Sequence, residues 1–273
     1  MSVGIELLRR FAPEWRFHSK EKYFPSNVEW FIERSKLYYK KRLLDANPDG
    51  DAMISQEING ETSGMDNGHI PNTNFYLKIN DKHTRRGNLQ ESKVYGRVYK
   101  NEGEDIHLQY WIFFPYNGNI LKPKIFPYAG VHEGDWEHVT VHLNRRYDNE
   151  FIRRVYMSAH GSEGKWHDLS QIETVETTHP VVYVAKSSHA CFREPGRQRR
   201  MVPIDTCCGE KRTRAGGFID DYTDSTGFRW RSWNFVEELE DGDLPDWCKF
   251  RGDWGKPKSR FLEGNGPTGP VFK

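Results

Sequence analysis

The sequence predicts a mainly β protein, an antiparallel β-sandwich with an N-terminal helix and long irregular loops. Aromatic residues make up 14% of the 273 residues, and aromatic side chains suit the pleated, half-buried surface of a sheet. From Phe75 onward, short alternating stretches follow one another, separated by turns rich in Gly, Asn and Asp. No long helix intervenes between them, which is typical of antiparallel sheets packed face to face.

The elements are expected in the following order. A helix covers Asn27–Leu44, where apolar residues recur at helical spacing, and Ser26 with Glu29 forms its capping box. Asn47-Pro48-Asp49-Gly50 ends that helix, and residues 57–73 form a polar loop. Strands are then expected at Phe75–Ile79, Lys93–Lys100, Ile106–Pro115, Trp136–Asn144, Ile152–His160 and Pro180–Lys186.

The C-terminal third is expected to be less regular. Arg193–Arg214 is a basic loop punctuated by Gly and Pro, Phe228–Leu239 is a short helix, and Phe250–Lys273 is an irregular tail. The length suits a single domain over residues 1–273. Residues 1–50 are predicted to be a helical extension that packs on a sandwich of about 75–273.

Composition and charge exclude several classes of protein. The 40 basic and 39 acidic residues leave a formal charge of +1, so no overall field attracts nucleic acid. No apolar run is long enough to span a bilayer, and the first residues lack the apolar core of a signal peptide. The four cysteines form no CxxC pair. We expect an intracellular protein, cytoplasmic or peripheral to membranes, without a transmembrane segment.

The stretch Val131–Leu143, VHEGDWEHVTVHL, concentrates the residues that carry chemistry. Side chains of a strand alternate between faces, so Asp135 and Glu137 share the row of three aliphatic side chains that faces the interior. The other row faces away from that interior and holds Trp136, His138, Thr140 and His142. A carboxylate on an interior row must be paired or must bind a cation, which makes Glu137 hard to explain as a packing residue.

Two histidines are expected to reach the same end of the sandwich. Trp136–Asn144 and Ile152–His160 flank a polar turn, and a symmetric hairpin pairs residues whose numbers sum to about 295. That register places His160 opposite Asp135. A third strand runs directly into His189. The plainer alternatives are that both histidines are ordinary hydrogen-bonded strand ends and that Asp135 satisfies turn amides.

The residue types at this end are those that bind hard and borderline cations. Carboxylates and imidazoles suit Ca²⁺, Mg²⁺ or Mn²⁺, and Zn²⁺ is also compatible with them. His132, in the turn before the strand, can fold over the same end as Asp135 and Glu137. The basic stretch Arg193–Arg214 follows His189 and is either a solvated loop or a lid that attracts anions.

The order of motifs along the chain resembles the vacuolar protein sorting-associated protein 62 family. The likeness runs from about Phe11 to the C-terminus, and the name of this family implies a role in trafficking to the vacuole. It rests on Phe11-Ala12-Pro13, Lys22–Ser26, Val28–Phe31, HEGDWEHVTVHL, YMSAHGSEGKW, HPVVYVAKSSHA and the closing FRGDWG and GPTGP.

A more distant resemblance is to the necrosis- and ethylene-inducing peptide-like proteins, whose signature reads GHRHDWE. This likeness implies a β-sandwich that holds a divalent cation through an HxxDxE arrangement and binds sphingolipid headgroups. His132, Asp135 and Glu137 have that spacing. Asn117 stands where those proteins have an upstream carboxylate, and Gly134 replaces their second histidine, so the cation site departs from their pattern.

Three functions agree with these observations. The first is metal-dependent recognition of a polar headgroup, phosphate or sugar, linked to vacuolar or membrane trafficking. The second is a metal-dependent hydrolase or lyase, with Glu137 or Asp135 as ligand and base and with His160 and His189 as acid or orienting groups. The third is an adaptor whose cation only holds loops together. The oligomeric state stays open.

The candidate residues divide into two sets. The metal ligands are His132, Asp135, Glu137 and Asn117. The ligand-binding residues are Trp136 and Trp166 for stacking and Lys186, Arg193, Arg197 and Arg200 for electrostatic attraction.

Overall fold

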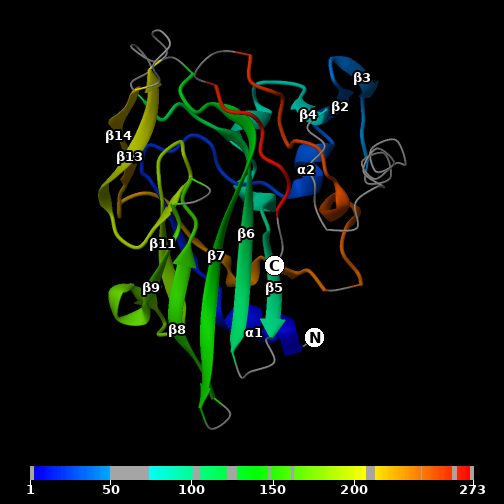
Figure 1. The fold of residues 1–273 in the computed structure, drawn as a ribbon. Helices are drawn as coiled ribbons and strands as arrows, with labels where there is room; N and C mark the ends of the chain where they lie inside the picture. The colour runs from blue at the N-terminus through cyan, green and yellow to red at the C-terminus, as the bar shows by residue number, and fades with distance from the viewer. Residues whose placement is uncertain are drawn as a thin grey trace.

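The computed structural model describes residues 3–49, 74–100, 105–121, 128–146, 149–160, 163–206, 213–240, 242–259 and 263–270. The predicted loop 57–73 lies outside these residues. Within them the strands form four sheets, and the two largest face each other, which confirms the predicted β-sandwich (Figure 1). A helix precedes the first strand and spans Val3–Phe11 (α1).

The larger sheet has six strands in the order β16-β5-β6-β7-β8-β9. Neighbouring strands are antiparallel, except that β16 runs parallel to β5. The strands predicted in this region are confirmed, with some shift of their ends. Their bounds are β5 Val94–Lys100, β6 Ile106–Asn117, β7 His132–Arg146, β8 Asn149–Met157, β9 Lys165–Asp168 and β16 Val236–Glu238.

The second sheet is smaller, and the N-terminal region supplies one of its inner strands. Its strands are β1 Glu14–Phe17, β10 Thr174–Val175, β11 His179–Val184, β12 Cys191–Phe192 and β15 Arg229–Arg231. β1 lies between β11 and β15 and runs parallel to β11. Residues 1–50 are therefore more than an extension packed on the sandwich, since part of them is built into it.

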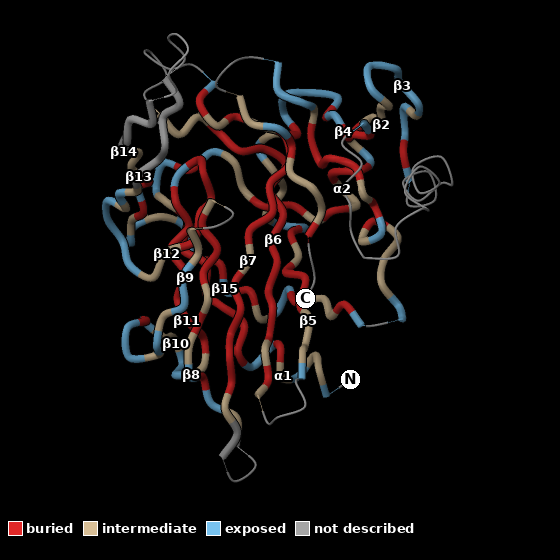
Figure 2. The backbone as a smooth tube through the Cα atoms, viewed as in Figure 1, coloured by how far each residue is buried: buried red, intermediate tan, exposed pale blue. Residues whose placement is uncertain are grey.

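The main core fills the space between the two sheets. β7 contributes Val139, Val141 and Leu143, as the alternating pattern predicted, and β1 contributes Trp15 and Phe17 from the opposite sheet. Helix α1 closes one end of this core with Leu8 and Phe11. Figure 2 shows the buried segments running along β6 and β7 through the middle of the molecule, with exposed segments around the edges.

The predicted helix Asn27–Leu44 is wrong beyond Ile32. The helix spans only Val28–Ile32 (α2), and its N-cap is Asn27, whose side chain accepts a hydrogen bond from the Trp30 amide at 2.6 Å. Ser26 instead forms a bridge with Phe113. The sequence that follows pairs as a sheet because strand pairing outweighs the weak helical spacing. That sheet contains β2 Ser35–Tyr39, β3 Arg42–Asp45 and β4 Phe75–Ile79.

A second apolar core lies on the outer side of the larger sheet. It joins α2 and the β2–β4 sheet to Trp136 of β7 and to aromatic residues of the C-terminal segment, including Trp247 and Trp254. The row of β7 that was predicted to face away from the interior is therefore buried at this end. The tail has no strand among its described residues beyond isolated bridges, as predicted.

The predicted basic loop Arg193–Arg214 is also wrong, because most of it forms a long hairpin. Its strands are β13 Gly196–Thr206 and β14 Thr213–Thr223, and their described ends pair Arg199 with Asp220. Alternating arginines opposite aspartates favour this pairing over a loop. Figure 1 shows the hairpin beside the end of the larger sheet at which β7 begins.

The remaining elements are short. The predicted helix Phe228–Leu239 is replaced by β15, a 3₁₀ turn and β16. The 3₁₀ helices are Thr84–Arg86, Leu89–Glu91, Leu169–Gln171, Ser232–Asn234 and Asp246–Lys249. Among the described residues, no helix is both long and apolar enough to cross a bilayer.

Candidate functional site

The first part of the site is a buried pair between Asp135 and His189. The Nδ1 atom of His189 lies 2.8 Å from Oδ2 of Asp135, and the histidine side chain is fully buried. Because a carboxylate only accepts, Nδ1 donates this hydrogen bond. Nε2 of His189 has no hydrogen-bond partner among the described residues. The pair therefore leaves one buried imidazole nitrogen available to a ligand.

The second part is Glu137, two residues further along β7 on the same face. Its carboxyl is buried and accepts a hydrogen bond from the Ser158 hydroxyl. Burial, followed by the negative charge of Asp135, raises the pKa of Glu137 well above its ordinary value. This carboxyl therefore keeps its proton to a higher pH than an exposed glutamate does, and in the protonated form it can donate a hydrogen bond to a ligand.

The third part comes from the hairpin. Asp221 of β14 is buried, and its Oδ2 lies 2.7 Å from Nε2 of His160. The Ser188 hydroxyl donates to Oδ1 of Asp221 at 2.6 Å, and Nε of Arg200 lies 3.5 Å from Oδ2. Burial acts to raise the pKa of Asp221, but the hydrogen bond from His160 and the charges nearby lower it overall. Asp221 is therefore held as a carboxylate.

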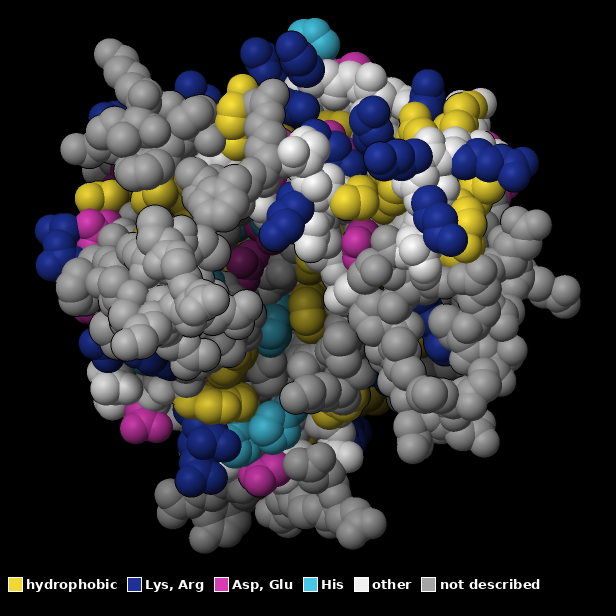
Figure 3. Space-filling model, turned by 45° about the horizontal axis from the view of Figure 1, so that its top comes forward, with side chains coloured by type: hydrophobic (Ala, Val, Ile, Leu, Met, Phe, Trp, Pro, Cys, Tyr) yellow, Lys and Arg dark blue, Asp and Glu magenta, His cyan; other side chains and the backbone are white. Residues whose placement is uncertain are grey.

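These three parts meet at one end of the sandwich. Ser188 and His189 are adjacent in the chain and contact Asp221 and Asp135, respectively, which brings the two aspartates to the same place. The charges of both aspartates add to burial in raising the pKa of Glu137. We call Asp135, Glu137, Asp221, His160 and His189 the carboxylate–imidazole site. In the space-filling view of this end, the surface is hollowed, and acidic and histidine side chains lie in the hollow (Figure 3).

The backbone around the site is held in an unusual conformation. His160, Ser187 and His189 have φ values of 45°, 67° and 58°, although none of them is glycine. Such conformations cost roughly 1–3 kcal/mol each and concentrate at functional sites. The turn that carries His189 is closed by backbone hydrogen bonds between Ala185 and the residues that return to it. These three backbone conformations therefore lower the stability of the fold at the positions that carry these side chains.

The structure changes the position expected for His160. β7 and β8 pair Val139 with Met157, within one residue of the predicted register. β8 ends at Met157, however, and His160 turns toward Asp221 instead of lying opposite Asp135. The prediction that His189 reaches the carboxylates of β7 is confirmed by its contact with Asp135.

The other two predicted metal ligands make backbone contacts. Nδ1 of His132 lies 2.7 Å from the carbonyl oxygen of Gly134, and the Asn117 amide donates to the Gly130 carbonyl at 2.7 Å. Asn117 and His132 are paired across β6 and β7. Among the described residues, no three His, Cys, Asp or Glu side chains are arranged as a ligand set for a metal ion. The divalent cation stays a prediction.

The two tryptophans predicted to stack on a ligand lie elsewhere. Trp136 is 9% exposed and packs against Phe113, Trp247 and Trp254 in the outer core, so the structure corrects its predicted stacking role. Trp166 is 39% exposed, but it lies on β9, on the outer face of the larger sheet. Neither ring contacts the carboxylate–imidazole site.

The predicted cationic residues are only partly at the site. Arg200 reaches Asp221, as described above, and also lies 3.4 Å from Glu163. Arg197 is paired with Asp220 on the exposed side of its own hairpin, and Arg193 is 3.7 Å from Glu194. Lys186 is exposed. The arginine cluster is therefore largely neutralised by its own neighbours and does not form the predicted anion-attracting lid.

Sequence reasoning missed three residues of this region. Asp221 was missed because the segment that contains it was not predicted to be a strand. In a strand, Phe218, Asp220 and Tyr222 lie on one face, and Ile219 and Asp221 lie on the other. Ser158 carries no sequence signal of its own. Glu133 is buried and accepts a hydrogen bond from the Ile79 amide at 3.3 Å, and burial raises its pKa.

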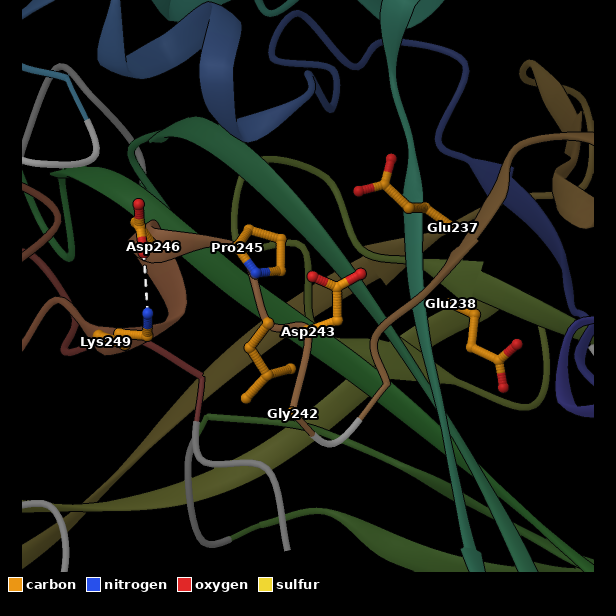
Figure 4. Close-up of a pocket in the computed structure, with 8 residues that line it drawn as sticks. Glu237, Glu238, Gly242, Asp243, Pro245, Asp246 and Lys249 are labelled. Atoms are coloured by element: carbon orange, nitrogen blue, oxygen red, sulfur yellow. Dashed lines mark hydrogen bonds and ion pairs between the residues drawn. The ribbon is translucent and has the colours of Figure 1, made fainter.

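A separate cavity of about 590 Å³ lies by β16, away from this site. Figure 4 shows its lining, in which Lys249 is paired with Asp246. Glu237, Glu238 and Asp243 also line it, which makes the cavity acidic. None of the residues predicted from the sequence lines this cavity.

The family model described as vacuolar protein sorting-associated protein 62 matches residues 4–268. The protein of that name from Saccharomyces cerevisiae (strain ATCC 204508 / S288c) is 23% identical over 308 aligned residues. The alignment covers 96% of this chain but 64% of that protein, so the chain spans somewhat less than two thirds of its curated relative.

Three solved structures are similar to the chain at a lower level. Necrosis and Ethylene inducing Protein 2, from the causal agent of cocoa's witches' broom disease, has a TM-score of 0.37 and 18% identity, covering 69% of this chain and 67% of that chain. A structure described as a toxin fold for microbial attack and plant defense has a TM-score of 0.42 and 14% identity. NLPPya in complex with mannosamine has a TM-score of 0.41 and 11% identity. The last two matches each cover 96% of this chain and 82% of the other.

Proposed function

The chain belongs to the vacuolar protein sorting-associated protein 62 family, and from that premise we propose that it is a recognition module for a polar headgroup. The carboxylate–imidazole site binds the hydroxyl or amine groups of a sugar-like ligand. One observation carries this proposal. Two strands, β7 and β14, bring Asp135, Glu137 and Asp221 together at a buried position where packing alone gives no reason for three carboxyl groups.

The hydrogen-bonding capacity of the site fits a polyhydroxylated ligand. Asp135 and Asp221 accept hydrogen bonds, while protonated Glu137 can also donate one. His189 adds a buried Nε2 that no described residue engages. A sugar presents donors and acceptors on adjacent carbons, so it can use both kinds of group at once.

The charge of the site argues against a free phosphate. Arg200 is the permanently charged basic residue next to Asp221, and its guanidinium is engaged by the carboxyl groups of Asp221 and Glu163. A phosphate approaching Asp135 and Asp221 would meet charges of its own sign. Phosphate binding would require a cation between the ligand and the protein. The site in its protein-only form therefore favours neutral or amine-bearing ligands.

A divalent cation remains part of the proposal. The carboxyl groups of Asp135 and Glu137 are ligands suited to Ca²⁺, Mg²⁺ or Mn²⁺, and the unengaged Nε2 of His189 would also suit Zn²⁺. A bound cation would neutralise these carboxylates and bridge to ligand oxygens. His132 and Asn117 would have to exchange their present backbone contacts to join it.

The family name suggests where such recognition is used. We propose that the protein acts in trafficking toward the vacuole, as an intracellular protein that meets headgroups at a membrane surface. Because this chain spans less than two thirds of its curated relative, the activity of that whole protein is carried over only as part of this proposal.

A hydrolase or lyase is the second candidate, and one observation favours it. The raised pKa of Glu137 favours the protonated form that a general acid needs, while the neighbouring Asp135 is paired with an imidazole. Carboxyl groups held in different protonation states are a common arrangement for acid–base chemistry. This candidate uses the same site and differs from the first only in turnover.

Calorimetric titration tests the proposal with glucose, glucosamine and inorganic phosphate, each with and without added Ca²⁺. We expect the sugars to bind, with the amino sugar tighter, and we expect phosphate to bind only with the cation. Asp221→Asn should weaken sugar binding, whereas Asp220→Asn on the exposed side of the hairpin should not. Sugar binding that is equal in both variants would contradict the proposal. Product formation from ester, phosphodiester or glycoside substrates would favour the enzyme.

A further inference from the structure

A second group of rings lies on the outer face of the larger sheet, below the part covered by the outer core. We call it the outer-face ring cluster; it consists of His107, His138, His142, Tyr156 and Trp166. Its rings come from β6, β7, β8 and β9 and touch one another in sequence across the sheet. Figure 3 shows histidine, hydrophobic, basic and acidic side chains side by side on the lower part of this face.

One end of the cluster is a stacked pair of imidazoles. His107 and His142 are directly opposite each other in the β6–β7 register, and their ring centroids are 4.4 Å apart at an interplanar angle of 10°. Burial, followed by the charge of His142, lowers the pKa of His107. The neutral form of His107 is therefore favoured, and its ring nitrogens can both accept and donate hydrogen bonds.

His142 lies between two side chains of opposite charge. Nε of Arg154 donates to Nδ1 of His142 at 3.1 Å, so that nitrogen carries no proton. Nε2 then carries the proton and lies 3.1 Å from Oδ1 of Asp105. Arg154 and Asp105 therefore place one positive and one negative charge against His142, and these two charges balance.

Trp166 provides the exposed surface of the cluster. The guanidinium of Arg154 lies 4.4 Å from its ring centroid, and the ring of Tyr156 is 5.6 Å away. These contacts hold the indole in place, yet the residue stays 39% exposed on an edge strand. An indole that is held rigidly but left exposed offers a flat face to a ligand at little entropic cost.

Packing alone explains this arrangement poorly. If these residues served only to pack the sheet, we would expect buried apolar side chains, as on the opposite face of the same strands. Here three imidazoles, a phenol and an indole come together on one face. His142 is buried, whereas His107, His138 and Tyr156 are partly exposed and Trp166 is exposed. His138 and His142 alone span roughly 13 Å along β7, from the strand rise, which exceeds one monosaccharide.

We propose that the outer-face ring cluster is a second ligand site, which takes an uncharged oligosaccharide and stacks one sugar ring on Trp166. The apolar face of a sugar ring fits an indole, while its hydroxyls fit the mixed donors and acceptors of His107, Arg154 and Asp105. The absence of net charge among these groups favours a neutral ligand over phosphate or an acidic peptide. This site is independent of the carboxylate–imidazole site.

Calorimetry and saturation-transfer NMR test it with three hexasaccharides: chitohexaose, cellohexaose and mannohexaose. We expect at least one to bind at millimolar concentration or better. Trp166→Ala should weaken that binding about tenfold, and Trp166→Tyr should restore most of it. Phe228→Ala removes an aromatic residue that is more exposed than Trp166, at 51% against 39%, from the other side of the sandwich and should change nothing. Circular dichroism of each variant checks that it is folded.

Three results would overturn this inference. One is that none of the hexasaccharides binds the wild type, and another is that Trp166→Ala binds as tightly as the wild type. The third is binding to phosphatidylcholine vesicles that Trp166→Ala abolishes, without any binding to oligosaccharide, which would assign the cluster to membrane contact. Asp135→Asn separates the two sites, since it should leave hexasaccharide binding intact even if monosaccharide binding at the carboxylate–imidazole site is lost.

Discussion

His189 is held by two neighbours that the β6–β7 register places side by side. Phe114 lies directly opposite Asp135 in that register. The His189 ring stacks on Phe114, with centroids 3.7 Å apart and planes 2° apart, while its Nδ1 hydrogen-bonds Asp135. One strand pair therefore fixes both the plane and the tautomer of an imidazole that arrives from a distant turn.

Removing the partner of His189 should destabilise the fold. Asp135→Ala leaves a buried imidazole N–H without an acceptor, which costs about 1–3 kcal/mol. Urea denaturation of both proteins at neutral pH measures the difference. Asp220→Ala breaks an exposed pair with Arg197 and Arg199 and should change the free energy of unfolding little. Equal effects of the two substitutions would contradict the buried pair.

Glu137 should make stability depend on pH. Its folded-state pKa is raised above the ordinary value of 4.5, so the folded protein holds this proton more tightly than the unfolded chain. The resulting stability is present below about pH 4.5 and is lost as the pH rises toward the folded-state pKa. Glu137→Gln keeps the shape and removes the titration. Thermal melts should therefore show a larger gain for this variant at about pH 8 than at about pH 5.

The control for that experiment is Glu163→Gln, which neutralises a more exposed carboxylate next to Arg200. It should show no such gain at high pH. A melting temperature of Glu137→Gln that follows the wild type at every pH would rule out the raised pKa as a factor in stability.

A cation at the site should appear as metal-dependent stabilisation. If Ca²⁺, Mg²⁺, Mn²⁺ or Zn²⁺ binds, a concentration 100-fold above Kd adds about 2.7 kcal/mol to the free energy of unfolding. We expect thermal melts to show this gain in the wild type and to lose it in Asp135→Asn. Asn117→Ala should keep it, because the Asn117 amide is engaged by the Gly130 carbonyl. A wild type that responds to neither metal nor chelator would contradict the cation.

The two tryptophans should respond differently to truncation. Trp136→Ala empties the centre of the outer core and should cost about 3–5 kcal/mol in the free energy of unfolding. Trp166→Ala removes a partly exposed ring and should cost much less. Denaturant unfolding of both variants tests this ranking. The reverse order would mean that Trp136 does not pack as the structure describes.

The local pattern of the sequence was sufficient for the strands of the larger sheet. Alternation in Trp136–Asn144 assigned Val139, Val141 and Leu143 to the interior, and the polar turn after it set the register of β7 and β8 within one residue. Those signals are local, since side-chain alternation and turn chemistry act over a few residues. The helix over Asn27–Leu44 failed because pairing of β2 with β4 depends on residues far apart in the chain.

The sequence by itself therefore determined the β-sandwich class, the family resemblance and the carboxylate row of Asp135 and Glu137. The tertiary structure decided which residues join that row. Asp221 and Arg200 come from the β13–β14 hairpin, part of which had been predicted as a loop. The fold also turns His160 toward Asp221 and buries Trp136. The physical reason is that burial and pairing arise from contacts between strands that are distant in the sequence. The alternating pattern of one strand does not show which other segment will pack against each of its faces.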